Sequence, residues 1–220
     1  MYSPEKARQN MVDCQIHPSN VVDPAILNAF ETVPREKFVP EAHKGTAYHD
    51  ENLIFKDGRF MMAPTTHARM LQSLNLSKND IALDIGCGNG YSSAILSSLV
   101  TTVIALESVQ KNLDDAQIIW DEMEYLNIAG FKGTLNKGCA NHAPYDVIII
   151  NGSCSELPTD IAMQLNDKGR LIYIQKDSNS AMGQVTLVKK TNDTLSSFSI
   201  FDASTPYLSG FEPREEFKFS

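Results

Sequence analysis

Residues 81–91, with the sequence IALDIGCGNGY, constrain the fold of this chain more than any other stretch. An apolar, strand-like run containing Asp84 leads into three glycines at alternate positions, Gly86, Gly88 and Gly90, and an apolar helical pattern follows. Glycines at such a turn can adopt positive φ and let backbone amides approach a ligand closely. The start of the helix adds unpaired N–H donors and partial positive charge. The stretch therefore predicts a strand, turn and helix that form a nucleotide-type cradle.

Glu107 follows the next apolar run, residues 103–106, at a distance from Gly86 that suits a β-α-β unit. A carboxylate at the carboxyl end of a strand can accept hydrogen bonds from both hydroxyls of a ribose. Tyr91 stands where the dinucleotide pattern G-x-G-x-x-G has its third glycine, which disfavours a nicotinamide oxidoreductase. We expect the amides of residues 86–90 and the acid at 107 to hold the adenosine half of a cofactor.

The length and charge of the chain fit one acidic domain. The 220 residues contain 19 Lys and Arg against 27 Asp and Glu, which gives a net charge of -8. A chain of this length can bury a substantial core. Binding to phosphate backbones needs a clustered basic face, so this balance argues against a nucleic-acid partner.

The four cysteines are scattered along the chain, without a C-x-x-C pair or a histidine at metal-ligand spacing. This pattern indicates reduced thiols of a cytosolic protein and neither a disulfide framework nor a metal site. The N-terminal residues lack an apolar signal core, and no run approaches the length of a membrane span. We expect a cytoplasmic protein that binds no metal and no membrane.

The N-terminal 60 residues predict a helical arm. One helix is expected to end at His17, because the residue before a proline disfavours helical geometry. A second is expected to begin at Asp23–Pro24. A turn at Asp57–Gly58 then precedes a helix that carries His67.

The remaining chain predicts an α/β sheet followed by antiparallel strands. After the glycine turn the expected elements are a helix with Ser108 as its N-cap, a weak strand at 132–136, buried strands at 145–150 and 170–174 with a short helix at 157–165 between them, and a hairpin of 184–188 with 197–201. These elements predict a doubly wound, mostly parallel sheet with helices on both faces. We expect a single domain over 1–220, divided into an arm (1–60), a cofactor-binding core (61–175) and C-terminal antiparallel strands (176–220).

Over nearly all its length the chain resembles protein-L-isoaspartate O-methyltransferases, a family of class I S-adenosylmethionine-dependent methyltransferases. The segments that carry the resemblance are, besides the glycine turn with Asp84, residues 12–15, 33–40, 47–50, 63–70 and 143–146. The resemblance implies transfer of a methyl group from S-adenosylmethionine to the α-carboxyl of L-isoaspartyl residues in damaged proteins or peptides, and so protein repair.

Two departures from the family weaken this inference. The usual Thr-Ile-Ser stretch, whose serine lies beside the transferred methyl, corresponds here to Phe60, Met61 and Met62. With Met62 at the serine position, the catalytic residue is unknown. The usual Gly-Asp pair that holds the adenine amino group corresponds to Gly138–Cys139. The alternative is therefore an S-adenosylmethionine-binding protein with another acceptor or with no catalysis.

The candidate cofactor-binding residues come from the motif and from the resemblance. They are His67, Asp84, Gly86, Cys87, Gly88, Gly90, Tyr91, Glu107, Gly138 and Cys139. Two of them keep alternative readings: Asp84 either braces the backbone or contacts the cofactor indirectly, and His67 either faces the cofactor or packs on its helix. Tyr145 and Asp146 are expected to be structural.

Overall fold

The computed structural model describes residues 3–56 and 58–213. Asp57 of the predicted turn and the end of the predicted C-terminal region lie outside these residues. The strands are β1 (Leu53–Ile54), β2 (Phe60–Met61), β3 (Ile81–Ile85), β4 (Thr102–Glu107), β5 (Ile128–Lys132), β6 (Tyr145–Cys154), β7 (Leu165–Gln175), β8 (Gly183–Thr191) and β9 (Thr194–Ala203). The α-helices are α1 (Pro4–Met11), α2 (Pro24–Thr32), α3 (Pro64–Leu74), α4 (Tyr91–Ser97), α5 (Gln110–Glu122) and α6 (Thr159–Ala162).

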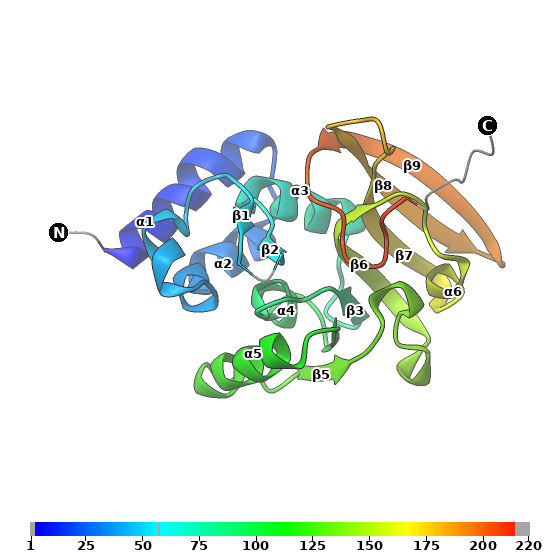
Figure 1. Ribbon diagram of the computed structural model, residues 1–220, viewed down its shortest axis with the longest axis horizontal. Helices are drawn as coiled ribbons and strands as arrows, with labels where there is room; N and C mark the ends of the chain where they lie inside the picture. The colour runs from blue at the N-terminus through cyan, green and yellow to red at the C-terminus, as the bar shows by residue number, and fades with distance from the viewer. Residues whose placement is uncertain (1–2, 57, 214–220) are drawn as a thin grey trace, which may run out of the picture.

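The main sheet has the strand order β5-β4-β3-β6-β7-β8-β9 (Figure 1). Strands β3 to β7 are parallel, and β8 and β9 are antiparallel. The predicted doubly wound sheet and C-terminal hairpin are thereby confirmed. The chain moves outward from β3 to β4 and β5, then returns to the other side of β3 as β6. Ligands of open α/β sheets bind outside the carboxyl ends of the strands at such a reversal of strand order.

The two faces of the sheet are covered unequally. The helices α3, α4 and α5, together with the N-terminal arm, bury one face in a large core that includes Phe30, Leu71 and Trp120. The opposite face has a smaller core, covered by α6, by Leu135 and by residues 205–211 near the C-terminus. Apolar side chains of β3 and β6 contribute to both cores, because successive side chains of a strand point to opposite faces of the sheet.

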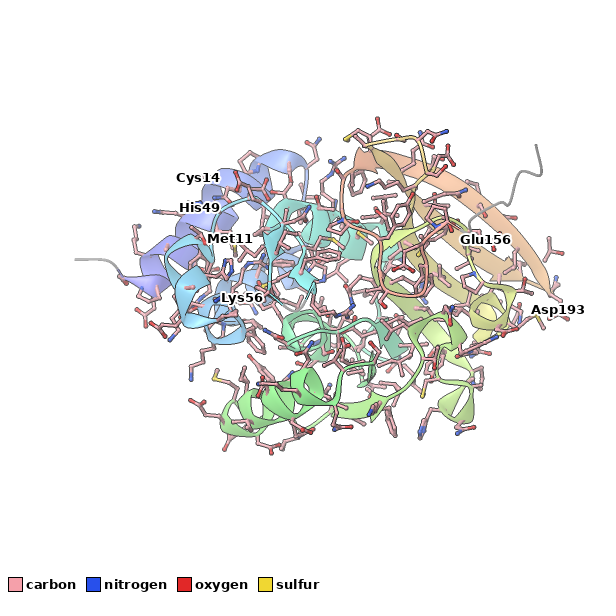
Figure 2. All side chains as sticks on the ribbon, in the orientation of Figure 1. Met11, Cys14, His49, Lys56, Glu156 and Asp193 are labelled. Atoms are coloured by element: carbon pink, nitrogen blue, oxygen red, sulfur yellow. The ribbon has the colours of Figure 1, made fainter. Side chains whose placement is uncertain are left out.

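The N-terminal arm is tied to the rest of the molecule by a buried arginine. Arg35 follows α2 in a 3-10 turn (Arg35–Phe38) and is completely buried. Its Nε donates to the carbonyl of Ala47 at 2.7 Å, and its Nη2 donates to the carbonyl of Met62 at 2.7 Å. The arm therefore fixes the backbone just before α3, next to the glycine turn. Figure 2 shows Met11 in this arm, at the opposite end of the molecule from Glu156 in the loop after β6.

Three predicted element boundaries were wrong. The strand expected at 132–136 is β5, which ends at Lys132 and is followed by a 3-10 turn (Leu135–Lys137) that buries Leu135. Ser108 is not an N-cap: Val109 takes that position, and the Ser108 hydroxyl bonds Glu107 instead. The short helix after β6 covers only α6, because residue 165 already begins β7.

No helix within residues 3–56 and 58–213 is long and apolar enough to cross a membrane.

Candidate functional site

The glycine turn between β3 and α4 has the backbone that the sequence predicted. Gly86, Gly88 and Gly90 have φ values of 74°, 55° and 90°. Gly90 is also required for packing, because a Cβ there would lie 2.7 Å from the ring of Trp120 on α5. The Trp120 indole N–H donates to the carbonyl of Gly90 at 3.1 Å. The turn is therefore held in place by Trp120 of α5.

Asp84 braces the turn. Its side chain is completely buried, and Oδ2 accepts hydrogen bonds from the hydroxyls of Ser92 and Ser93 at the start of α4. Oδ1 accepts from the amide of Asn151, which lies on β6. Burial raises the pKa of Asp84, and the three hydrogen bonds oppose that shift. These contacts support the bracing interpretation, and they join β3, α4 and β6 at the point where strand order reverses.

Glu107 ends β4 beside the turn, where the sequence placed it, and it is completely buried. Its Oε2 accepts from the Gly88 amide at 2.9 Å and pairs with Nη2 of Arg59 at 2.6 Å. Its Oε1 accepts from the amides of Ser108 and Val109. The carboxylate is thus fully hydrogen-bonded within the protein.

Arg59 is the site residue that the sequence analysis missed. It comes just before β2, at the end of the arm, and 8% of its side chain is exposed. Nothing in the local pattern signalled this position, because the partner, Glu107, is 48 residues further along the chain.

A second contribution to the site comes from residues 205–211, which we call the C-terminal strap. The strap runs alongside the carboxyl end of β6 (Figure 1), where Ser153 and Tyr207 form an isolated parallel bridge. The Ser153 amide donates to the carbonyl of Pro206 at 2.9 Å, and the Leu208 amide donates to the carbonyl of Ser153 at 3.0 Å. Leu208 lies so close to the glycine turn that a Cβ on Gly86 would be 2.8 Å from its Cδ1.

The space that remains between these groups is small. The cavity beside the glycine turn has a volume of about 30 Å³, whereas ligand pockets typically measure about 300–1,000 Å³. Its lining residues are Phe55, Phe60, Met61, Met62, His67, Gly86, Cys87, Asn89, Tyr91, Ser92 and Asn151. The predicted residues His67, Cys87 and Tyr91 therefore converge here.

Two polar side chains of the cavity lining are buried with few hydrogen bonds. His67 Nε2 has no hydrogen-bond partner among the described residues. The Tyr91 hydroxyl interacts with the Arg35 guanidinium, although no hydrogen bond of good geometry joins them. Burial, and secondarily the charge of Arg35, lowers the pKa of His67 to about 3, so the imidazole is neutral at physiological pH. Burial raises the pKa of Tyr91 to about 12. The neutral His67 imidazole can therefore act as a hydrogen-bonding partner of a ligand.

Gly138 and Cys139 lie in different surroundings from the glycine turn. A Cβ on Gly138 would be 2.5 Å from the Gln164 side chain, and the Cys139 amide donates to Oε1 of Gln164 at 2.8 Å. The Tyr145 hydroxyl donates to the Cys139 carbonyl at 2.6 Å, in keeping with the structural role expected for Tyr145. A cofactor contact at these two positions stays a prediction.

No cluster of three or more His, Cys, Asp or Glu side chains that could hold a metal ion occurs in the described part of the chain.

The sheet, its glycine turn and the acid at the end of β4 define the class I methyltransferase fold. A solved protein-L-isoaspartate O-methyltransferase superposes with a TM-score of 0.82 at 24% identity, covering 94% of this chain and 66% of that chain. A putative protein-L-isoaspartate O-methyltransferase from Plasmodium falciparum, solved in complex with S-adenosyl-L-homocysteine, gives a TM-score of 0.78 at 21% identity and covers 92% of this chain and 98% of that one.

Sequence comparison assigns the family. The family model for protein-L-isoaspartate(D-aspartate) O-methyltransferase matches residues 6–204. The protein-L-isoaspartate O-methyltransferase of Desulfotalea psychrophila is 36% identical over 166 residues, which is 76% of this chain and 78% of that protein. The enzyme of the same name from Aliivibrio fischeri is 31% identical over 180 residues, covering 82% and 86% of the two chains. The chain belongs to the protein-L-isoaspartate O-methyltransferase family.

Proposed function

We propose that this protein transfers a methyl group from S-adenosylmethionine to the carboxylate of L-isoaspartyl residues in damaged proteins. The family assignment supports this activity. The structural observation that carries it is the meeting of three positive-φ glycines with the buried carboxylate of Glu107 at the point where strand order reverses. Such a crevice is where open α/β sheets bind nucleotides.

The chemical groups at the site are of the types that bind an S-adenosyl nucleoside. A carboxylate at a strand end matches the two hydroxyls of a ribose, and the unsatisfied His67 Nε2 offers a neutral partner to a polar atom of the ligand. The conformation described here does not leave room for the nucleoside, because Arg59 and Leu208 occupy the approach to Glu107 and Gly86. Binding therefore requires these two side chains to move.

The chain's own residues would act by positioning. When bound, S-adenosylmethionine supplies an electrophilic methyl group on a sulfonium. The acceptor carboxylate is already ionised at neutral pH, so the site needs no general base. Holding donor and acceptor in near-attack geometry can supply about 7–11 kcal/mol of the barrier reduction. The neutral His67 and the fixed backbone at Met62 fit a role in orientation.

The acceptor side of the crevice is more apolar than the family pattern predicts. Met62, at the position of the family serine, lines the cavity together with Phe60 and is 5% exposed. This observation favours a second candidate function, nucleoside binding without isoaspartyl methylation. Two additional proposals rest on composition and thiols: a cytoplasmic location, from the four free cysteines, and no nucleic-acid partner, from the net charge of -8.

The test is methylation of an isoaspartyl peptide by labelled S-adenosylmethionine. We expect a base-labile methyl ester on this peptide and none on the same peptide with a normal aspartate. Glu107→Gln is expected to reduce the yield by at least about tenfold, because a hydrogen bond to a charged group contributes about 1.5–3 kcal/mol. The matched control is Glu31→Gln, an exposed glutamate on α2, with unchanged yield.

A second experiment separates the two candidate functions. The double variant Met62→Ser with Cys139→Asp restores the family residues and is expected to methylate the isoaspartyl peptide faster than the unchanged protein. If S-adenosylhomocysteine binds in calorimetry, and neither the unchanged protein nor the double variant forms an ester, the second candidate replaces the first.

A further inference from the structure

The buried ion pair between Arg59 and Glu107 is not required to stabilise the Glu107 carboxylate. Glu107 already accepts backbone hydrogen bonds from Gly88, Ser108 and Val109, so its charge is stabilised without the arginine. Arg59 adds a fourth nitrogen donor, Nη2 at 2.6 Å from Oε2. That guanidinium nitrogen also lies close to the glycine turn, since a Cβ on Gly86 would be 3.2 Å from it.

The strap supplies a second obstacle from the other end of the chain. The methyl groups of Leu208 would lie 2.8 and 2.9 Å from a Cβ on Gly86. The side chain also packs over the end of β6, where a Cβ on Gly152 would be 2.9 Å from Leu208 Cβ. Leu208 is 1% exposed. Arg59 and Leu208 thus both lie close to Gly86. Arg59 is a cation paired with Glu107, and Leu208 is an apolar side chain that fills the space beside the turn.

We propose that Arg59 and Leu208 form a self-occluding closure that competes with the nucleoside for Glu107 and Gly86 and thereby sets the affinity of the site. This proposal rests on the proposed function, because it assumes that the site takes an S-adenosyl nucleoside. Arg59 is a competing and positioning residue and has no part in the reacting groups. The ligand binds as the guanidinium leaves Oε2 and the strap withdraws from Gly86.

The closure should lower nucleoside affinity measurably. A ligand that displaces Arg59 forms its own hydrogen bonds to Glu107. Its binding also breaks the charge-assisted hydrogen bond between Arg59 and Glu107 in the free protein. Such a bond corresponds to about a ten- to hundredfold change in a binding constant. Removing the guanidinium leaves Glu107 with its backbone donors, so the acid stays available for the ribose.

Calorimetric titration with S-adenosylhomocysteine tests the closure without relying on activity. Arg59→Gln is expected to bind about ten- to hundredfold more tightly than the unchanged protein, while its melting temperature without ligand falls because a buried ion pair is lost. The matched control is Lys56→Gln, which removes the same charge from an exposed position of the same turn (labelled in Figure 2) and should leave the affinity unchanged.

A second variant keeps the ion pair intact and so covers the case in which Arg59→Gln fails to fold. Leu208→Ala should also raise the affinity, whereas Leu195→Ala, on the exposed face of β9, should not. In the unchanged protein, saturating S-adenosylhomocysteine should speed hydrogen exchange at the Leu208 amide, which bonds Ser153 in the closed state.

The outcomes separate this proposal from the function on which it rests. Equal or weaker binding by both Arg59→Gln and Leu208→Ala would overturn the closure and leave the function intact. A Leu208 amide that stays equally protected in the saturated protein would overturn the part assigned to the strap. No binding by any variant, with no ester on the isoaspartyl peptide, would overturn both the closure and the function.

Discussion

Single residues at this site owe their properties to burial. His67 lies on α3 with 2% of its surface exposed, and the neighbouring charge of Arg35 adds to the effect of burial. The imidazole ring packs edge-on against Phe30 and Tyr91. The structure shows that His67 packs in the core and also lines the cavity, and a contact with the cofactor stays a prediction.

His67 makes stability depend on pH in a defined window. Its pKa is about 6.5 when unfolded and about 3 in the folded protein, so the unfolded state binds the proton more readily. The stability contribution is fully present above pH 6.5 and is lost as the pH falls toward 3. At pH 5 the loss is about 2 kcal/mol.

Urea unfolding at pH 7 and pH 5 measures this effect. His67→Gln should lose less stability over this interval than the unchanged protein, by about 2 kcal/mol, and the exposed control His49→Gln should behave like the unchanged protein. An identical loss in the protein with Gln at position 67 would contradict the assignment.

At the scale of elements, the glycine turn shows how a local motif becomes fixed by a distant helix. The sequence predicted the turn and, separately, a helix beginning after Ser108, which is α5 (Gln110–Glu122). The structure adds that Trp120 packs directly beneath Gly90, with 1% of its surface exposed. The turn therefore tolerates no side chain at that position.

Gly90→Ala should destabilise the protein strongly. Alanine at a φ of 90° is strained by about 1–2 kcal/mol, and its Cβ would lie 2.7 Å from the Trp120 ring. We expect a total loss of at least about 2 kcal/mol in the free energy of unfolding. Gly45→Ala, where nothing lies within 4 Å of the added Cβ, should change stability little. Chemical denaturation compares the two variants, and similar losses in both would refute the packing argument.

At the scale of the whole molecule, a few polar side chains join segments that are far apart in the sequence. Arg170 on β7 donates to the carbonyls of Leu74 and Asn75 at the end of α3 and pairs with Asp80 at 2.7 Å. These contacts hold the chain entering β3 against the middle of the sheet. The position of the glycine turn therefore depends on them.

Arg170→Met should cost about 2–4 kcal/mol of folding stability, because it leaves Asp80 and two carbonyls without this partner. The side chains of this pair are 17% and 9% exposed. The control is Lys111→Met on α5, whose pair with Asp115 is 79% and 48% exposed and should contribute less than about 1 kcal/mol. Thermal unfolding of both variants gives the comparison, and equal shifts would show that burial is not the deciding factor.

The sequence by itself determined the parts of this protein that are encoded locally. Strand periodicity, the alternate glycines and the acid after β4 predicted the sheet, the turn and the position of Glu107, because each depends on residues within one β-α-β unit. The C-terminal hairpin was equally readable from its alternation and its turn at 192–193. The division into arm, core and C-terminal strands stays a prediction, as do the individual cofactor contacts.

Only the tertiary structure determined which side chains lie against the glycine turn. Arg59 meets Glu107 across 48 residues, and Leu208 reaches Gly86 from beyond the last strand. β5 likewise begins and ends earlier than its composition indicates, where its register with β4 places Lys132 opposite Glu107. A local pattern carries no information on such contacts, since they depend on how separate elements pack. The sequence therefore predicted where a nucleoside would bind, and the packing of two distant segments determined which side chains lie against Glu107 and Gly86.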